Sequence, residues 1–105
     1  MAEVKLARLD EIPEAGMTVK EHEGFSVLLA RCGGEILAMD DICTHSGAPL
    51  HEGRLGERGE CFVTCPWHAA SFDLRTGIVV QETPWATDTR VYRVRVEGDD
   101  VYVEL

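Results

Sequence analysis

An antiparallel all-β sandwich or barrel is the fold that the sequence predicts, and three observations support it. Short apolar or alternating segments, six or more in number, recur at intervals of roughly eight to twelve residues. Glycine and proline residues, which terminate regular structure, stand between these segments. No stretch keeps a helical apolar period over about ten positions, so no long amphipathic helix is expected.

Four strands are expected in the first half of the chain. The first covers residues 4–9 and, after a turn-rich connection, the second covers 17–20. The apolar, partly β-branched run 25–30 predicts a buried strand, and the chain continues through Gly33-Gly34 into a fourth strand at 35–39. Because paired glycines between apolar segments favour a tight turn, these last two strands form the most definite hairpin of this half.

The second half predicts a strand at 61–64, a hairpin of 72–74 with 78–80, and a final hairpin of 91–96 with 101–105. The segment 91–96 alternates with period two, which is typical of a strand with one buried face. The expected faces are Tyr92, Val94 and Val96 on one side, and Arg93 and Arg95 on the other.

The segment from about 40 to 72 differs from the rest of the chain. Its density of glycine and proline argues for loops, with 61–64 as its one expected strand. Irregular stretches of this length are unusual inside a small domain. They become stable when a metal centre supplies cross-links that a core would otherwise provide, so the segment predicts a metal site.

Composition limits the classes of partner. The 105 residues fit one domain, and the net charge of −9 disfavours nucleic acid and anionic membranes, which require a basic surface. No apolar run approaches the roughly 20 residues that span a bilayer. The first residues lack the basic and apolar regions of a signal peptide, so we expect a cytoplasmic protein. No pairing of a nucleophile with a base is visible, which argues against an enzyme with its own substrate.

Four cysteines are present, and they fall into two classes. Cys43 and Cys65 stand beside histidines at ligand spacing, whereas Cys32 and Cys61 do not. Since disulfides are rare in reducing compartments, we expect Cys32 and Cys61 to be free, partly buried thiols.

Two short loops carry the metal-site prediction: Cys43-Thr44-His45 and Cys65-Pro66-Trp67-His68, with 19 residues between His45 and Cys65. Thiolates and imidazoles are the donors that zinc and iron–sulfur centres take. A zinc site would usually pair cysteine with cysteine and histidine with histidine, whereas each loop here mixes the two. The mixed order favours a two-iron centre with both thiolates on one iron and both imidazoles on the other, and a zinc-stabilised interaction module is the alternative.

On these two loops the chain resembles the Rieske-type [2Fe–2S] proteins, in particular the small soluble ferredoxins. The resemblance implies one cluster per chain, with Cys43 and Cys65 on the inner iron and His45 and His68 on the outer iron. It also implies a single Rieske domain over 1–105. The expected parts of this all-β domain are a base of residues 1–41 and 74–105 and a loop-rich cluster-binding subdomain of about 42–73.

Departures from the respiratory Rieske proteins point to the soluble, low-potential branch. The respiratory proteins carry an extra disulfide between the two loops, where this chain has Ala48 and Trp67. They also place serine and tyrosine hydroxyls against the cluster, where this chain has Ala70 and Phe72. Because neither side chain donates a hydrogen bond, we expect a potential near the low end of the Rieske range, roughly −150 mV.

The resemblance implies a one-electron carrier that passes electrons from a flavoprotein reductase to a terminal oxygenase. Docking is expected near His45, His68, Trp67 and Trp85, and long-range steering suits an acidic carrier. The alternative within the family is a fixed small subunit of a reductase complex such as nitrite reductase.

Overall fold

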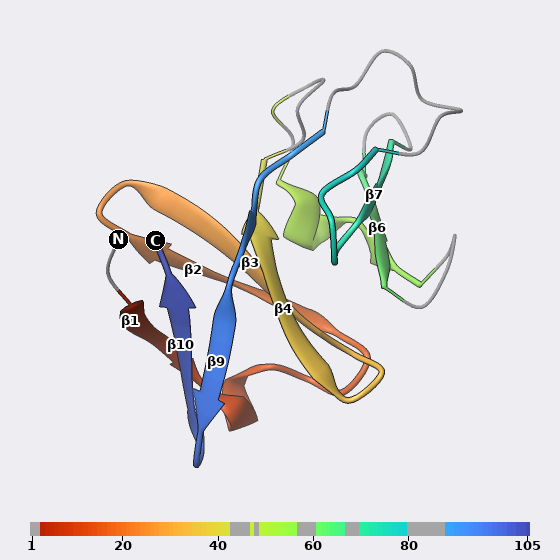
Figure 1. Cartoon of the computed structure of the whole chain (residues 1–105). Coiled ribbons are helices and arrows are strands. Elements are labelled where there is room, and N and C mark those ends of the chain that lie inside the picture. The colour runs from red at the N-terminus through yellow and green to blue at the C-terminus, as the bar shows by residue number, and fades with distance from the viewer. Residues whose placement is uncertain (1–2, 43–46, 48, 57–60, 67–69, 80–87) are drawn as a thin grey trace.

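The computed structural model describes residues 3–42, 47, 49–56, 61–66, 70–79 and 88–105. Within them ten strands form three antiparallel sheets (Figure 1). The outer sheet has the order β1-β10-β9, the central sheet β2-β3-β4-β8, and the small sheet β5-β6-β7. The bounds are β1 Glu3–Arg8, β2 Met17–His22, β3 Phe25–Cys32, β4 Glu35–Asp40, β5 Arg54–Leu55, β6 Phe62–Thr64, β7 Ser71–Asp73, β8 Val91–Tyr92, β9 Val94–Glu97 and β10 Asp100–Glu104. The prediction of an all-β fold is confirmed.

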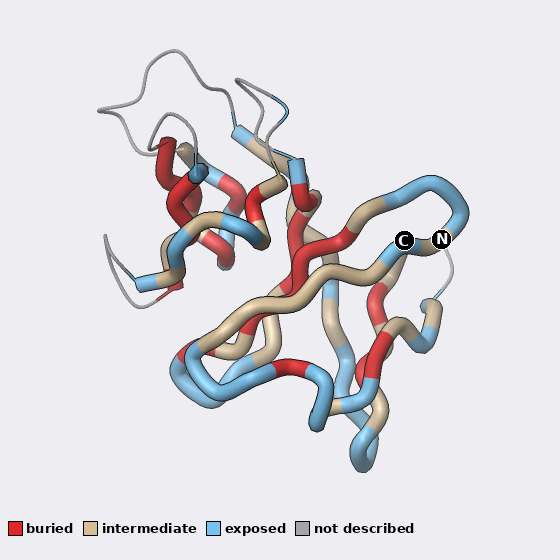
Figure 2. Tube along the Cα trace, turned by 180° about the vertical axis from the view of Figure 1, so that it is seen from behind, coloured by how far each residue is buried: buried red, intermediate tan, exposed pale blue. Residues whose placement is uncertain are grey.

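Strand β3 lies at the centre because both of its faces are apolar. Leu28, Ala30 and Cys32 belong to one buried cluster, which they share with residues of the small sheet. Val27 and Leu29 alternate with them and belong to a second buried cluster, shared with the outer sheet. Since successive side chains of a strand point to opposite faces, the continuous apolar run of β3 joins two cores. Buried residues accordingly gather where the sheets meet, and the distal turns are exposed (Figure 2).

The hairpin predicted around Gly33-Gly34 is confirmed. β3 pairs with β4 from Val27 opposite Asp40 to Cys32 opposite Glu35, so the turn contains the two glycines alone. Both glycines have positive φ values, 59° and 79°, a region that side chains with a Cβ disfavour. The two glycines therefore fix the turn, and the turn fixes the register in which Cys32 lies opposite Glu35.

The predicted strand 91–96 is in fact two strands. β8 pairs with β4 of the central sheet, whereas β9 pairs with β10 of the outer sheet, and Arg93 lies at the break between them. The predicted inward face is correct at Tyr92 and Val94, which pack against the second core, but Val96 is 44% exposed. An alternating apolar pattern predicts which residues face a core. It does not predict that β8 and β9 pair with strands of different sheets.

Three smaller elements were not predicted from the sequence. β5 has only two residues, and the two 3-10 turns η1 (Leu9–Glu11) and η2 (Leu50–Glu52) have three each, which is too short for a periodic signal. The hairpin expected at 72–80 reduces, within the described residues, to β7 and an isolated bridge between Phe72 and Val79.

The prediction for Cys32 and Cys61 was wrong. The two residues form a disulfide, with their Cα atoms 5.7 Å apart, and each is 3% exposed. They are 29 residues apart in the chain, and nothing in their sequence surroundings pairs them. Their common place in one buried cluster of the folded chain brings the two sulfur atoms together.

No described helix is long and apolar enough to cross a membrane.

Candidate metal centre

The first predicted ligand loop is closed at its base by Asp41. The main-chain oxygen of Asp41 accepts a hydrogen bond from the Leu50 amide at 3.0 Å, and its Oδ1 accepts one from the His51 amide at 2.7 Å. Ile42 and Pro49 form a β-bridge immediately inside this closure. The stretch between them contains Cys43 and His45, which lie outside the described residues. The closure fixes Ile42 and Pro49, the two ends of the segment that contains both residues.

Asp41 is also the one buried carboxylate among the described residues, at 3% exposure. Its Oδ2 lies 2.6 Å from Nδ1 of His51. Burial raises the pKa of the Asp41 carboxyl, and the hydrogen bonds from His51 oppose part of that rise. The half-buried His51 therefore offsets part of the free-energy cost of burying the Asp41 carboxylate.

Replacing Asp41 by alanine should destabilise the protein by about 2–3 kcal/mol, because a buried amide and an imidazole lose their acceptor. The urea midpoint, followed by far-ultraviolet circular dichroism, measures this change. His51→Ala is the matched control, since it removes the ring contact and leaves the backbone closure intact. An Asp41→Ala variant as stable as His51→Ala would show that the carboxylate does not hold the loop.

The second predicted loop leaves and re-enters one hairpin. The amide of Cys65 donates to the carbonyl oxygen of Ala70 at 2.7 Å, directly beyond the register pair of Thr64 with Ser71. Thr64 and Ser71 are buried, and their hydroxyl oxygens lie 2.9 Å apart in a hydrogen bond. The loop 65–70, which contains His68, is therefore tied at both ends by main-chain and side-chain bonds. His68 lies outside the described residues.

The register of the small sheet brings both loops to the same end. β5 pairs antiparallel with β6, with Arg54 opposite Thr64 and Leu55 opposite Val63. Because the two strands are antiparallel, the start of β5 lies beside the end of β6. The first loop precedes β5 in the chain, and the second loop follows β6. Leu50, at the exit of the first loop, is fully buried in the core cluster that contains Cys65.

Gly53 lies where the two segments touch. A Cβ at Gly53 would lie 1.9 Å from the carbonyl oxygen of Thr64, although its φ of −84° is one that any residue adopts. The close approach of two backbones is thus the reason that position 53 is glycine.

Gly53→Ala should therefore cost about 3 kcal/mol, because the added methyl group must push the two loop-bearing segments apart. The urea midpoint measures the loss. Gly34→Ala is the control: its φ is also unfavourable for alanine, at +79°, but a Cβ there meets nothing within 4 Å. Equal losses in the two variants would contradict the close contact.

The described residues fit an iron–sulfur centre at this end. Cys65 is 1% exposed and belongs to an apolar cluster with Leu50, Ala70 and Phe72. A thiolate that binds a metal has its charge compensated, whereas an uncompensated one would be costly in such surroundings. Within the part of the chain that the structure describes, which excludes the three other predicted ligands, no three metal-binding side chains gather.

Ala70 and Phe72 lie on the same face of the small sheet as Cys65. Val63 pairs with Phe72 in the register of β6 with β7, and cross-strand partners share a face. The period of two then places Ala70 with Cys65 on that face, and both Ala70 and Phe72 are fully buried. The two positions that distinguish the low-potential branch are thus beside the predicted ligand.

Comparison with known proteins identifies the family. The model of the Rieske [2Fe-2S] domain matches residues 2–95. The chain belongs to the Rieske [2Fe–2S] family. The cofactor is therefore a Rieske cluster, and the alternative of a zinc module is excluded.

Curated relatives are similar over almost the full length. The chain is 33% identical over 102 residues to the ferredoxin component of the naphthalene 1,2-dioxygenase/salicylate 5-hydroxylase systems of Ralstonia sp, covering 97% of this chain and 94% of the relative. It is 36% identical over 95 residues to the 3-phenylpropionate/cinnamic acid dioxygenase ferredoxin subunit of Escherichia coli K12, covering 90% and 86%.

Solved structures agree with this result. The ferredoxin of carbazole 1,9a-dioxygenase from Nocardioides aromaticivorans IC177 matches with a TM-score of 0.87 and 29% identity, over 98% of this chain and 97% of that one. A ferredoxin from a complex of reduced oxygenase and oxidised ferredoxin of a carbazole 1,9a-dioxygenase matches with a TM-score of 0.84 and 26% identity, over 96% and 91%. A protein assigned as a nitrite reductase small subunit matches with a TM-score of 0.84 and 24% identity, over 100% of both chains, which shows a shared fold alone.

The structure thus describes one of the four predicted Rieske ligands, Cys65, together with the closures of both ligand loops. Ala48, Trp67 and Trp85 lie outside the described residues. Sequence reasoning missed Asp41, His51 and Gly53 as the residues that hold the loops. A charged residue two positions before Cys43 was the available signal for Asp41, but acidic residues are common throughout this chain.

Proposed function

We propose that this Rieske protein is the ferredoxin component of a ring-hydroxylating dioxygenase system. It carries one electron at a time from a flavoprotein reductase to a terminal oxygenase. The observation that carries the proposal is the near full-length similarity to curated dioxygenase ferredoxins at 33% and 36% identity. The solved complex of a related ferredoxin with its oxygenase supports direct docking between the two proteins.

The proposed ligands of the cluster are Cys43, His45, Cys65 and His68. When bound, the cluster supplies reversible uptake of one electron, with two thiolates on one iron and two imidazoles on the other. The proposed cluster-binding subdomain, residues 42–73, contains all four ligands and the small sheet, and 1–41 with 74–105 form the base. Such a division makes the small sheet the scaffold for both ligand loops.

The chain's own residues exclude water around the buried ligand and withhold hydrogen bonds from it. Leu50, Ala70 and Phe72 are each fully buried in the cluster of side chains around Cys65. Neither Ala70 nor Phe72 has a side-chain donor, so the extra negative charge of the reduced state gains no hydrogen bond from these two side chains. This arrangement supports a potential near the low end of the Rieske range.

The proposed docking surface surrounds the ligand histidines and includes Trp67 and Trp85. Among the described residues, Ile42 adds an apolar contact beside it: Ile42 directly precedes Cys43 and is 53% exposed. Apolar side chains near the exit point suit the small, transient interfaces of redox proteins, and the net charge of −9 suits steering toward a basic partner.

Stopped-flow mixing of the reduced protein with an oxidised terminal oxygenase of the ring-hydroxylating class tests the proposal. We expect rapid reoxidation of the ferredoxin, slowed by Ile42→Asp at low partner concentration. Val96→Asp is the matched control, since Val96 is also exposed but lies on β9 of the outer sheet. Reoxidation no faster than in the absence of oxygenase would overturn the assignment.

A fixed small subunit of a reductase complex is the remaining alternative within the family, and it has only fold-level similarity in its favour. Gel filtration of the natural protein separates the two, because a carrier elutes alone and a fixed subunit elutes with its complex. A cytoplasmic location remains a prediction.

A further inference from the structure

The disulfide between Cys32 and Cys61 joins two parts of the molecule that share no sheet. Cys32 ends β3 of the central sheet, and Cys61 immediately precedes β6 of the small sheet. The strand pairing runs within each sheet and not between them. The chain itself connects the small sheet to the rest through the segment after β4 and the segment before β8. The disulfide is a further covalent connection.

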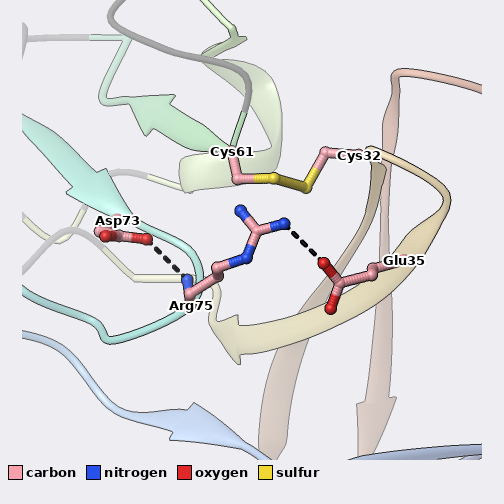
Figure 3. The surroundings of a disulfide bond; sticks show 5 residues. All are labelled: Cys32, Glu35, Cys61, Asp73 and Arg75. Carbon is pink, nitrogen blue, oxygen red and sulfur yellow. Dashed lines mark hydrogen bonds and ion pairs between the residues drawn. A yellow bond between two sulfur atoms is a disulfide. The ribbon is translucent and has the colours of Figure 1, made fainter.

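An ion pair lies beside the disulfide and joins the same two parts (Figure 3). Glu35, which is opposite Cys32 in the β3–β4 register, accepts a hydrogen bond from Nη2 of Arg75 at 2.6 Å. Arg75 follows Leu74, whose amide donates to the carbonyl oxygen of Cys61 at 2.8 Å. Since Glu35 and Arg75 are about half exposed, their ion pair contributes little, and the covalent bond dominates the connection.

The disulfide is attached to the strand that carries a predicted cluster ligand. Cys61, Val63 and Cys65 occupy every second position along β6 and its flanks, so the period of two of a strand places them on one face. Cys32 and Cys61 belong to the same buried cluster as Cys65. A change in how Cys61 is held therefore acts on the strand that positions Cys65.

A cavity of about 250 Å³ borders the disulfide at Cys32. Its walls include Gly33, Gly34 and Gly56, which have no side chains to close it, and Arg31 also lines it. A small thiol can approach Cys32 from this side, where Glu14 also lines the cavity and forms an ion pair with Arg31 at 2.9 Å.

We propose that Cys32 and Cys61 form a redox-responsive clamp that fixes the small sheet to the central sheet and thereby slows loss of the cluster. The clamp closes by exchange with a low-molecular-weight disulfide such as oxidised glutathione. One protein thiolate attacks that disulfide and releases one small thiol, and the second protein thiolate then displaces the other. Two electrons pass to the small disulfide, which leaves as two thiols with the two protons.

Alkylation after acid release of the cluster measures the state of the clamp. The chain has four cysteines, so intact mass spectrometry should count two carbamidomethyl groups when the clamp is closed and four when it is open. Across a series of glutathione buffers, the number of carbamidomethyl groups should change from two under oxidising conditions to four under reducing conditions. Four groups at every buffer ratio, or two at every ratio, would overturn the redox response.

Cluster retention and amide exchange measure the consequence. We expect the closed form to lose its visible absorbance to an iron chelator more slowly than the open form, by on the order of 100-fold from loop closure over this separation. The amides of Val63 and Thr64 should exchange faster in the open form. The Cys32→Ala/Cys61→Ala variant is the control, and its rates should equal those of the open form at every glutathione ratio.

Equal rates for the closed and open wild-type forms would overturn the clamp even if the double variant fails to fold. The effect on cluster retention rests on the proposed ligand role of Cys65, whereas the alkylation count and amide exchange need no cluster. Failure of the clamp is therefore distinguishable from failure of the proposed carrier function.

Discussion

Cys65→Ala will be colourless, with no iron bound to the purified chain. Cys65 lies at the end of β6, buried at 1% exposure, and the proposed centre draws one of its two thiolates from this position. Histidine and water cannot replace a buried thiolate on the inner iron, because soft sulfur donors are what hold an iron–sulfur cluster together. Visible absorbance and iron analysis of the anaerobically purified variant measure the loss.

Cys61→Ala is the matched control for this substitution, since Cys61 is buried on the same face four residues earlier. It should retain the red-brown colour and the iron, although it loses them faster to a chelator because the clamp is open. A Cys65→Ala protein that keeps a full complement of iron would remove Cys65 from the ligand set. A colourless Cys61→Ala would show that the assignment of roles along β6 is wrong.

Introducing hydroxyl groups at Ala70 and Phe72 will raise the reduction potential. Both positions lie on the face of the small sheet that carries Cys65, and both side chains are fully buried and have no hydrogen-bond donor. In Ala70→Ser/Phe72→Tyr each new hydroxyl can donate to a sulfur atom, and such bonds strengthen when the added electron increases the negative charge.

The expected rise is roughly 65 to 130 mV for each hydroxyl that reaches a sulfur atom. A hydrogen bond to a charged group contributes ~1.5–3 kcal/mol, and a tenfold change in a one-electron equilibrium corresponds to about 59 mV. Potentiometric titration followed by visible circular dichroism gives the potentials of the wild type, both single variants and the double variant. The wild-type value should lie near the low end of the Rieske range, roughly −150 mV.

Two results would contradict this explanation of the potential. One is a wild-type potential well above zero, which would mean that donors other than these two hydroxyls already stabilise the reduced state. The other is a double variant that binds its cluster normally but has an unchanged potential. The urea midpoint of each variant separates an electronic effect from overpacking, because Phe72→Tyr adds an oxygen atom to a side chain that is already fully buried.

The parts of the fold that were predictable are those with a local chemical signal. The hairpin of β3 with β4 follows from an apolar run, two glycines and a second apolar run, and the structure confirms it. The burial of β3 on both faces follows from the same unbroken run. The two ligand loops were found because thiolate and imidazole at short spacing carry a specific chemistry, and the family match supports that interpretation.

The parts that were not predictable depend on contacts between segments far apart in the chain. The break at Arg93 arises because β8 and β9 pair with different sheets, which alternation cannot report. The Cys32–Cys61 disulfide and the fit of Gly53 against Thr64 arise from packing of the small sheet. The pairing of Asp41 with His51 also depends on tertiary burial, since the buried carboxylate of Asp41 requires a partner.

Electron–nuclear double resonance tests whether two histidines are ligands of the cluster. The protein is labelled with ¹⁵N at histidine alone, reduced with dithionite and measured by electron–nuclear double resonance. The chain has four histidines, and we expect strong coupling from two of them, with one coupling lost in His45→Cys and the other in His68→Cys. A reduced cluster without strong coupling to histidine nitrogen would show that the histidines are not ligands.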